Sequence, residues 1–410
     1  MGSHRFILDG HPDFELGIPR KRPITVNLET PQSDIADGLV FLVPGMGSER
    51  QEEYSAMLRR YISAKHNLVV VSVDAHCNVC RPHRSEGVDS VVMNIQSESI
   101  YEALGRFIGN GAHVDRALTN LNDMLALLIS AKSETFDFNA IIEPPDGDYQ
   151  NFGVLAALDH LTVLNELLDS DFAYDHENII CLGSSHGGYL AHLIHKFAPN
   201  TISGVIDASA YTETMPKFID GKYNEAHEIE GNIRYRCSTK THWQFNRPDE
   251  KTFFGADRAA IRDVGDLAHL EQVANLANRK CQFRMVHSSF DKLSPPELKL
   301  RQAGILASLG YDVQLDMIGE ADIDGKFIKS LGHGMGISLE LLFDKYYPTF
   351  EKRSGKIDRE IGTTLCFEGP KYAYRIEHRP NSIYLDTVCE ELIIGSAKSG
   401  SRKSRDRLAG

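Results

Sequence analysis

One short segment near the middle of the chain restricts the possible folds more than any other. Residues 179–190 read IICLGSSHGGYL, and a helix-spaced apolar pattern continues from Tyr189 to Phe197. The short apolar run predicts a buried strand, and the periodic run after it predicts a helix. Gly183 and Gly187 flank Ser185 at two residues on either side, so the segment reads strand, Gly-x-Ser-x-Gly, helix.

This layout is that of a nucleophile elbow, a strand-to-helix turn that presents a serine hydroxyl above the edge of a sheet. Small residues are needed on both sides because the strand and helix backbones approach closely. Ser184 does not satisfy the pattern, since its corresponding neighbours are Leu182 and His186. A glycine-rich turn without chemistry would give the same letters, so Ser185 needs partner residues elsewhere in the chain.

The composition indicates a globular protein and gives no support to several other classes. Hydrophobic residues make up 42% and charged residues 25% of the 410 residues, and the formal net charge is −13. That charge offers no overall attraction to nucleic acid. No apolar stretch is long enough to span a membrane, and the first residues lack the apolar core of a signal peptide. Seven scattered cysteines do not suggest a disulfide framework. We therefore expect a cytoplasmic protein with neither nucleic acid nor membrane as a partner.

Valine-rich apolar runs alternate with helical patterns along most of the chain, which predicts an α/β fold with a mostly parallel sheet and helices on both faces. The expected strands include residues 39–43, 68–73, 179–182, 202–206, 282–286 and 313–318. The expected helices are residues 52–64, 98–132, 151–168, 296–309 and 337–347.

The domain organisation follows from where this alternation starts, breaks and stops. Residues 1–37 are expected to form N-terminal strands, and residues 38–347 the α/β domain. A polar segment, about residues 211–279, interrupts the rhythm and is interpreted as a cap insertion, with a plain surface elaboration as the alternative. Residues 348–394 predict a C-terminal β extension that either widens the sheet or pairs with the N-terminal strands. Residues 395–410 are rich in Ser, Gly, Lys and Arg and predict a disordered tail.

A serine hydroxyl needs a base to remove its proton, and His333 is the best-placed histidine. It lies in the glycine-rich stretch SLGHGMG, residues 330–336, between the last expected strand and the closing helix. Such a loop can carry an imidazole over the sheet edge, and its glycines permit a close approach. With 17 histidines in the chain, a helix-capping loop with an incidental histidine is the alternative.

The base in turn needs a carboxylate to orient it, and in proteins with this elbow the acid lies between the serine and the histidine. Asp291 follows an expected strand directly and precedes a helix, which favours it. Asp207, at the end of the strand after the elbow, is the rival. The alternative role for Asp291 is that of a turn or helix-cap residue.

Two N–H groups must also converge on the negative oxygen that forms during acyl transfer. One is expected from His186, the residue after the serine. The other is expected from the loop after an early strand, where residues 44–47 read PGMG and Met46 is the candidate. An ordinary strand-end turn would have the same sequence.

Two other kinds of site were weighed. Residues 76–83 read HCNVCRPH, a C-x-x-C pair with a histidine at each end, but no second ligand pair at zinc-site spacing occurs elsewhere. We expect this segment to line the pocket and expect no metal. The chain also lacks a G-x-x-x-x-G-K-[ST] loop and a G-x-G-x-x-G motif after its first strand, so no nucleotide cofactor is expected.

With these motifs in place, roughly residues 38–347 resemble the α/β-hydrolase superfamily. The second glycine and the aromatic after the elbow, Gly188 and Tyr189, are similar to the prolyl-oligopeptidase-like branch, as are residues 286–311 and the loop Gly332-His333-Gly334. Peptidases of that branch carry a β-propeller ahead of the domain, for which the segment before Leu39 is too short. The nearest likeness is to a poorly characterised bacterial group of α/β-hydrolases.

The resemblance and the motifs together imply a serine hydrolase that cleaves an ester or other acyl bond through an acyl-enzyme, without a cofactor. Ser185, His333 and Asp291 would form the triad. The expected substrate is a small acylated molecule, with acylated sugars and peptides among the candidates. The alternatives are a serine peptidase, an acyltransferase and a non-catalytic binding protein on the same scaffold.

Overall fold

The structure is a computed structural model. It describes residues 2–45, 52–78, 92–95, 97–108, 127–128, 135–220, 227–230, 232–278, 280–353, 362–380 and 382–389. Its main body is built on an eight-stranded sheet in the order β1-β2-β4-β3-β7-β8-β11-β12. The strands are β1 (Gly2–Leu8), β2 (Ile24–Thr30), β3 (Leu39–Val43), β4 (Val69–Asp74), β7 (Ile179–Ser184), β8 (Gly204–Ala208), β11 (Gln282–Ser288) and β12 (Asp312–Ile318).

From β4 to β12 every neighbouring pair in this sheet is parallel, whereas β1 with β2 and β2 with β4 are antiparallel. The predicted N-terminal strands therefore form the antiparallel edge of the main sheet. A crossover places β3 between β4 and β7, so the carboxyl ends of β3, β7, β8 and β11 lie side by side. Ligands bind at this edge in open parallel sheets.

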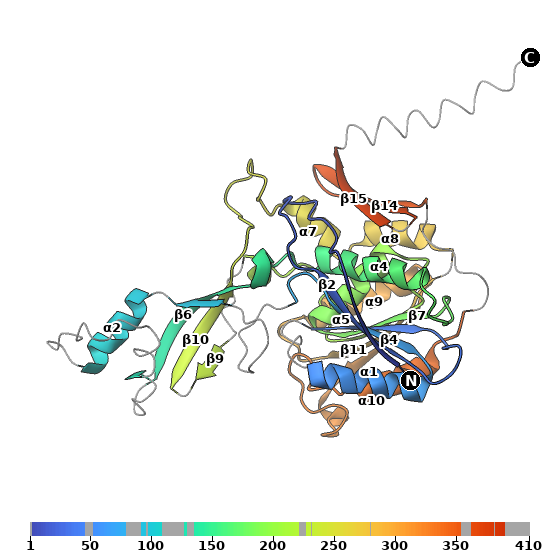
Figure 1. Ribbon diagram of the computed structural model, residues 1–410, viewed down its shortest axis with the longest axis horizontal. Helices are drawn as coiled ribbons and strands as arrows, with labels where there is room; N and C mark the ends of the chain where they lie inside the picture. The colour runs from blue at the N-terminus through green and yellow to red at the C-terminus, as the bar shows by residue number, and fades with distance from the viewer. Residues whose placement is uncertain are drawn as a thin grey trace, which may run out of the picture.

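Successive side chains along a strand point to opposite faces of the sheet and pack into two separate hydrophobic cores, as a sheet covered on both faces requires. On β3, Leu39, Phe41 and Val43 face the larger core, and Val40 and Leu42 face the smaller one. Helices α4 (Val154–Leu168), α5 (His186–Phe197) and α9 (Pro296–Ser308) contribute to the larger core. Helices α1 (Glu52–His66) and α10 (Leu339–Tyr346) cover the other face (Figure 1).

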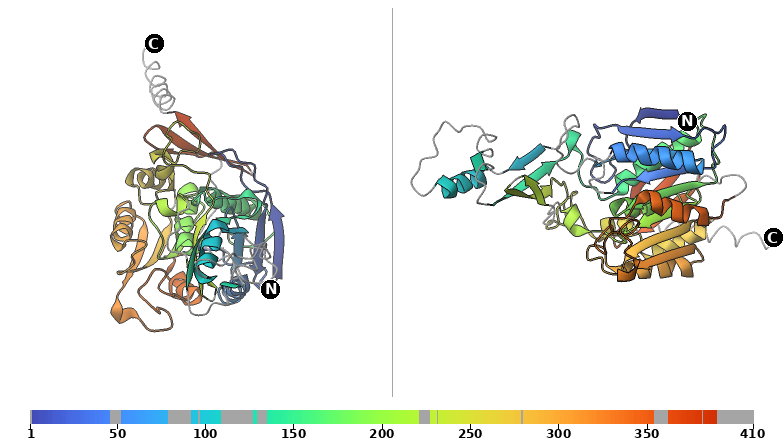
Figure 2. Two further views of the ribbon diagram at one scale, coloured as in Figure 1. Left: turned by 90° about the vertical axis from the view of Figure 1, so that its left-hand side faces the viewer. Right: turned by 90° about the horizontal axis from the view of Figure 1, so that it is seen from below.

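A second, four-stranded sheet extends away from the main body together with α2 (Ser97–Ile108), as Figures 1 and 2 show. It has the order β5-β6-β10-β9. The strands are β5 (Val92–Ile95), β6 (Phe136–Glu143), β9 (His227–Glu230) and β10 (Ile233–Thr239). This sheet differs from the predicted organisation, because β10, from the predicted cap segment, pairs in parallel with β6, which precedes α4 in the chain. Of the predicted helical stretch 98–132, the structure describes α2 and residues 127–128, and the rest lies outside the described residues.

The other described residues of the segment 211–279 are not part of this second sheet. They include α6 (Pro216–Ile219), α7 (Ala256–Arg262) and α8 (Leu267–Leu276). Helix α7 contacts the C-terminal strands β13 (Thr364–Glu368) and β14 (Tyr372–Arg379), α8 contacts β13, and α4 contacts β15 (Ser382–Cys389). These strands form a three-stranded antiparallel sheet of their own, rather than either expected alternative. The predicted tail, residues 395–410, lies outside the described residues.

The strand order, the crossover and the strand–turn–helix at Ser185 define an α/β-hydrolase fold, the class that the sequence predicts. Among the described residues, no helix is long and apolar enough to cross a membrane.

Candidate active site

Ser185 occupies a strained turn between β7 and α5. Its φ of 57° and ψ of −124° are unusual for a residue with a side chain. The turn is possible because of the flanking glycines. A Cβ on Gly183 would lie 2.3 Å from the carbonyl carbon of Gly187, and a Cβ on Gly187 would lie 2.2 Å from the oxygen of Val43. Both neighbouring atoms belong to the backbone and cannot move aside. This close approach of the strand and helix backbones explains why the sequence has glycine at both positions.

His333 reaches Ser185 from the loop between β12 and α10. Its Nε2 lies 2.7 Å from Ser185 Oγ. A hydrogen bond anchors this loop to the end of β8, since the N–H of Gly334 donates to Ser209 Oγ at 3.1 Å. Gly334 has a φ of +75°, a conformation that glycine adopts without strain. The histidine favoured by its position in the sequence is therefore the one beside the serine.

Asp291, in the turn after β11, lies on the far side of the imidazole. His333 Nδ1 donates to Asp291 Oδ2 at 2.8 Å, which leaves Nε2 free to accept the serine proton. The other carboxylate oxygen accepts the N–H groups of Leu293 and Ser294 at 2.9 and 3.0 Å. Burial favours the neutral acid, but the hydrogen bonds from His333 and Ser294 outweigh it and hold the pKa of Asp291 below its ordinary value. Asp291 is therefore ionised at neutral pH.

Asp207, the rival acid, is engaged in a different network. Its Oδ2 lies 2.6 Å from His192 Nε2 and 3.4 Å from Lys299 Nζ, and all three side chains are buried. Burial raises the pKa of Asp207, but Lys299 and His192 outweigh that effect and lower it to about 2. The partners of Asp207 belong to α5 and α9, so this carboxylate neutralises a buried lysine rather than orienting His333.

The two expected oxyanion donors are only partly described. His186 is the first residue of α5, where backbone N–H groups have no partner within the helix. Pro44 and Gly45 follow β3, while Met46 lies outside the described residues. The His186 ring packs against Phe152 and Tyr189. Burial lowers the pKa of His186 to about 4, so the ring is neutral at physiological pH.

Tyr211 also belongs to the site, although sequence reasoning did not select it. Its hydroxyl lies 3.3 Å from Ser185 Oγ, and its ring stacks on His333 with centroids 5.4 Å apart and planes 4° apart. The available signal was its position three residues after β8, the strand next to the elbow strand. In the sequence this residue reads only as the start of a polar segment.

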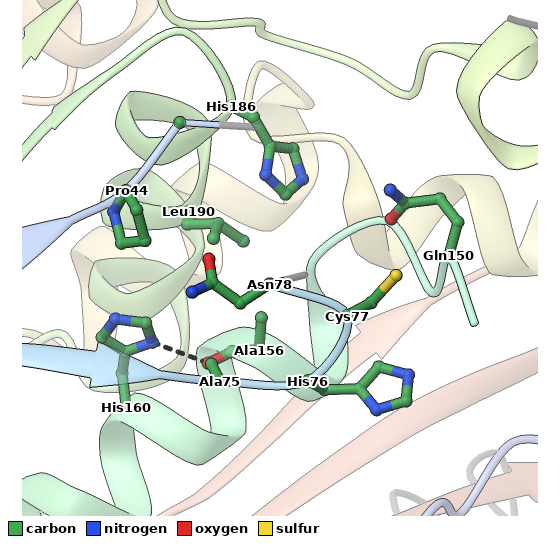
Figure 3. A pocket seen from close by; sticks show the side chains of 11 residues that line it. Pro44, Ala75, His76, Cys77, Asn78, Gln150, Ala156, His160, His186 and Leu190 are labelled. Atoms are coloured by element: carbon green, nitrogen blue, oxygen red, sulfur yellow. Dashed lines mark hydrogen bonds between the residues drawn. The ribbon is translucent and has the colours of Figure 1, made fainter. Parts of the chain in front are cut away.

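A pocket lies beside the elbow, and Figure 3 shows the side chains around it. It is narrow, with about 20 Å³ of space that the centres of water-sized molecules can reach. Its lining consists of Pro44, Gly45, Ala75, His76, Cys77, Asn78, Gln150, Ala156, His160, His186 and Leu190. Pockets beside a reactive group are where small ligands bind.

His76 and Cys77 from the C-x-x-C segment line this pocket, while Cys80 and His83 lie outside the described residues. His76 Nε2 donates to the backbone oxygen of Tyr149 at 2.9 Å. Within the described part of the chain, no three His, Cys, Asp or Glu side chains are arranged to hold a metal ion.

Solved structures similar to this chain include several hydrolases, all at low identity. The acylaminoacyl peptidase of Pyrococcus horikoshii is 14% identical, with a TM-score of 0.44 over 87% of this chain and 42% of that one. This chain thus spans less than half of that peptidase. An S-formylglutathione hydrolase from Agrobacterium tumefaciens is 14% identical, with a TM-score of 0.43 over 86% and 95% of the two chains. Est1E of Butyrivibrio proteoclasticus, solved with ferulic acid, is 12% identical, with a TM-score of 0.39 over 80% and 95%.

No curated protein matches the chain. A family model does match, and it spans residues 4–365, from β1 to the first strand of the C-terminal sheet. The chain is therefore a member of the DUF2920 family, which is described as a family of proteins of unknown function.

Proposed function

We propose that this protein is a serine hydrolase that cleaves an ester or other acyl bond through a covalent acyl-enzyme. The observation that carries the proposal is the pair of hydrogen bonds from Ser185 to His333 at 2.7 Å and from His333 to Asp291 at 2.8 Å. These distances lie within the range needed for proton transfer between a nucleophile, its base and an orienting acid.

In the first half of the reaction, Ser185 Oγ attacks the acyl carbonyl carbon while its proton passes to His333 Nε2. The resulting oxyanion accepts N–H groups at the elbow, of which His186 supplies one. The tetrahedral intermediate collapses as His333 returns the proton to the leaving group, and the acyl group remains on Ser185.

In the second half, water donates a proton to His333 and attacks the acyl carbon. The new intermediate expels Ser185 Oγ, which regains its proton from His333, and the free acid departs. Asp291 stays ionised throughout and stabilises the imidazolium. The low pKa of this buried carboxylate suits that role.

For the substrate we propose a small acylated molecule whose acyl or alcohol part enters the pocket beside the elbow. Esters, thioesters and acylated sugars fit this proposal better than long peptides. The pocket is small, and its walls include Ala156, Leu190 and neutral His186. Within the superfamily, the motif around Gly188 and Tyr189 favours the prolyl-oligopeptidase-like branch.

The test is a panel of chromogenic acyl esters, thioesters and peptide amides, measured with the wild type, Ser185→Ala and Ser184→Ala. We expect turnover of one ester class, which Ser185→Ala lowers by about 10⁴- to 10⁶-fold. Ser184→Ala, a matched change one residue away with no assigned role, should retain the activity. Equal turnover by the wild type and Ser185→Ala would reject the proposal.

A further inference from the structure

Tyr211 does more than line the site, because its hydroxyl comes within hydrogen-bonding distance of the proposed nucleophile. Its hydroxyl lies 3.3 Å from Ser185 Oγ, although its side chain is only 3% exposed. Among the described residues, the other side chain that hydrogen-bonds with this oxygen is His333. Tyr211 therefore touches the reacting atom itself, whereas Asp291 acts through the imidazole.

The direction of this hydrogen bond follows from counting protons. Asp291 fixes the proton of His333 on Nδ1, so Nε2 is an acceptor and the single serine proton points to it. Ser185 Oγ then has only lone pairs to offer to Tyr211. In this arrangement, which is the one ready for attack, the tyrosine hydroxyl is the donor across the 3.3 Å contact.

The backbone around Tyr211 is fastened to both of the loops that carry the other groups. Ser209, with a φ of +54°, accepts the N–H of Gly334 next to His333. The carbonyl of Ala210 accepts Ser294 Oγ at 3.0 Å, in the turn that holds Asp291. The tyrosine is thus positioned by the same contacts that position the base and the acid.

The ring makes contacts that are separate from those of the hydroxyl. It stacks on the imidazole of His333 and packs against Phe152 and Phe218. A phenylalanine could make these three ring contacts, whereas the contact with Ser185 Oγ needs the hydroxyl.

We propose that Tyr211 is a catalytic residue whose hydroxyl donates a hydrogen bond to Ser185 Oγ and stabilises the negative charge that develops on this oxygen during attack and deacylation. The inference rests on the proposed function. During attack, the O–H bond of Ser185 breaks toward His333 and the hydrogen bond from Tyr211 offsets the growing charge. During deacylation, the bond between Oγ and the acyl carbon breaks, and Tyr211 makes the serine oxygen a better leaving group. Tyr211 keeps its own proton in both steps.

The first test is Tyr211→Phe, which removes the hydroxyl and keeps the ring. Stopped-flow measurement with a chromogenic ester accepted by the wild type separates acylation, seen as the burst rate, from deacylation, seen as the steady state. We expect both rate constants to fall by about 10- to 100-fold, the effect of losing one hydrogen bond to a developing charge. The matched control is Tyr311→Phe, which removes another buried tyrosine hydroxyl. Tyr311 directly precedes β12, at the edge of the sheet opposite the elbow, so this change should alter both constants by less than about twofold.

A second variant covers the case in which Tyr211→Phe does not fold. Incorporation of a fluorinated tyrosine at position 211 keeps the ring and the hydroxyl but makes the phenol more acidic. Activity should then be lost at a lower alkaline pH than in the wild type, because a phenolate cannot donate. A purely structural tyrosine would leave that limb of the pH profile in place.

The outcomes separate this inference from the proposed function. An active wild type, an inactive Ser185→Ala and Tyr211→Phe constants within about threefold of the wild type would overturn the role of Tyr211 alone. An unshifted alkaline limb in the fluorotyrosine variant would do the same. If Ser185→Ala matches the wild type, the hydrolase itself is rejected before Tyr211 is tested.

Discussion

Asp291 precedes His333 by 42 residues and accepts a hydrogen bond from its Nδ1 at 2.8 Å. Between them the chain forms α9 and β12 and returns to the same edge of the sheet. The contact joins the turn after β11 to the loop after β12, and β11 and β12 are parallel neighbours. Neighbouring parallel strands thus explain how two distant residues meet beside Ser185.

The choice of acid can be tested by replacing each candidate with its amide. Asp291→Asn should lower kcat by about 10⁴-fold, because the amide can bind the imidazole in the wrong tautomer. The Asp291→Asn protein should still fold, which circular dichroism checks. Equal activity of Asp291→Asn and the wild type would remove Asp291 from the mechanism.

Asp207→Asn is the matched comparison and should affect stability instead. Lys299 is fully buried, and the substitution removes the negative charge it pairs with. Breaking a buried pair costs about 3–5 kcal/mol of unfolding free energy. Urea unfolding measures this loss, and kcat for the folded fraction should stay near that of the wild type. A stable but inactive Asp207→Asn protein would contradict the assignment.

The elbow glycines should tolerate no side chain. In Gly183→Ala the new Cβ would meet the Gly187 backbone at 2.3 Å, so we expect little soluble folded protein or a large drop in Tm. Gly304→Ala is the control, since this exposed glycine in α9 has nothing within 4 Å of the new Cβ. It should raise stability by about 0.5–1 kcal/mol. A well-folded, active Gly183→Ala protein would show that the turn is looser than described.

His195 should make the protein less stable in mild acid. Burial lowers its pKa from 6.5 to about 3, and its Nε2 has no hydrogen-bond partner within the described part of the chain. Between those two values the unfolded chain binds a proton that the folded protein excludes, so stability falls as the pH falls. The slope is at most about 1.4 kcal/mol per pH unit for one group.

The variant that tests this is His195→Leu, since the ring packs against Phe283 and Tyr311 in an apolar setting. Urea unfolding at pH 7, 6 and 5 should show a smaller loss of stability for His195→Leu than for the wild type. Parallel curves for the two proteins would mean that His195 does not contribute to the pH dependence.

Narrowing the pocket beside the elbow should weaken substrate binding and leave the reactivity of Ser185 unchanged. Ala156 lines it and is 6% exposed, so Ala156→Val narrows it with little change to the surface. We expect a higher KM and a preference for smaller acyl or alcohol groups, with labelling of Ser185 by a small probe unchanged. An unaltered KM across the ester panel would place substrate binding elsewhere.

Much of the main body could be predicted from the sequence because its signals are local. Buried parallel strands such as β3 and β4 read as short valine-rich runs, and the elbow is defined by glycines within five residues of chain. The structure also brings Ser185, His333 and Asp291 together, although their catalytic roles remain predictions.

The second sheet could not be predicted in the same way. Strand β6 finds its parallel partner in β10, about a hundred residues later, and neither strand reveals that pairing in its own sequence. Tyr211 could not be selected from the sequence for the same reason. Its contact with Ser185 exists only because the ends of β7 and β8 are neighbours in the folded sheet. The C-terminal strands could be recognised from the sequence, but their packing on α4, α7 and α8 depends on tertiary contacts.

The most direct measurement of the central claim is the site of covalent labelling by a fluorophosphonate probe. The probe forms a stable adduct only with a serine whose proton is taken by a nearby base. Intact mass followed by peptide mapping should show one adduct per chain, on Ser185 and not on Ser184, and His333→Ala should abolish it. A folded wild-type protein that stays unlabelled, or an adduct that persists in His333→Ala, would contradict the account.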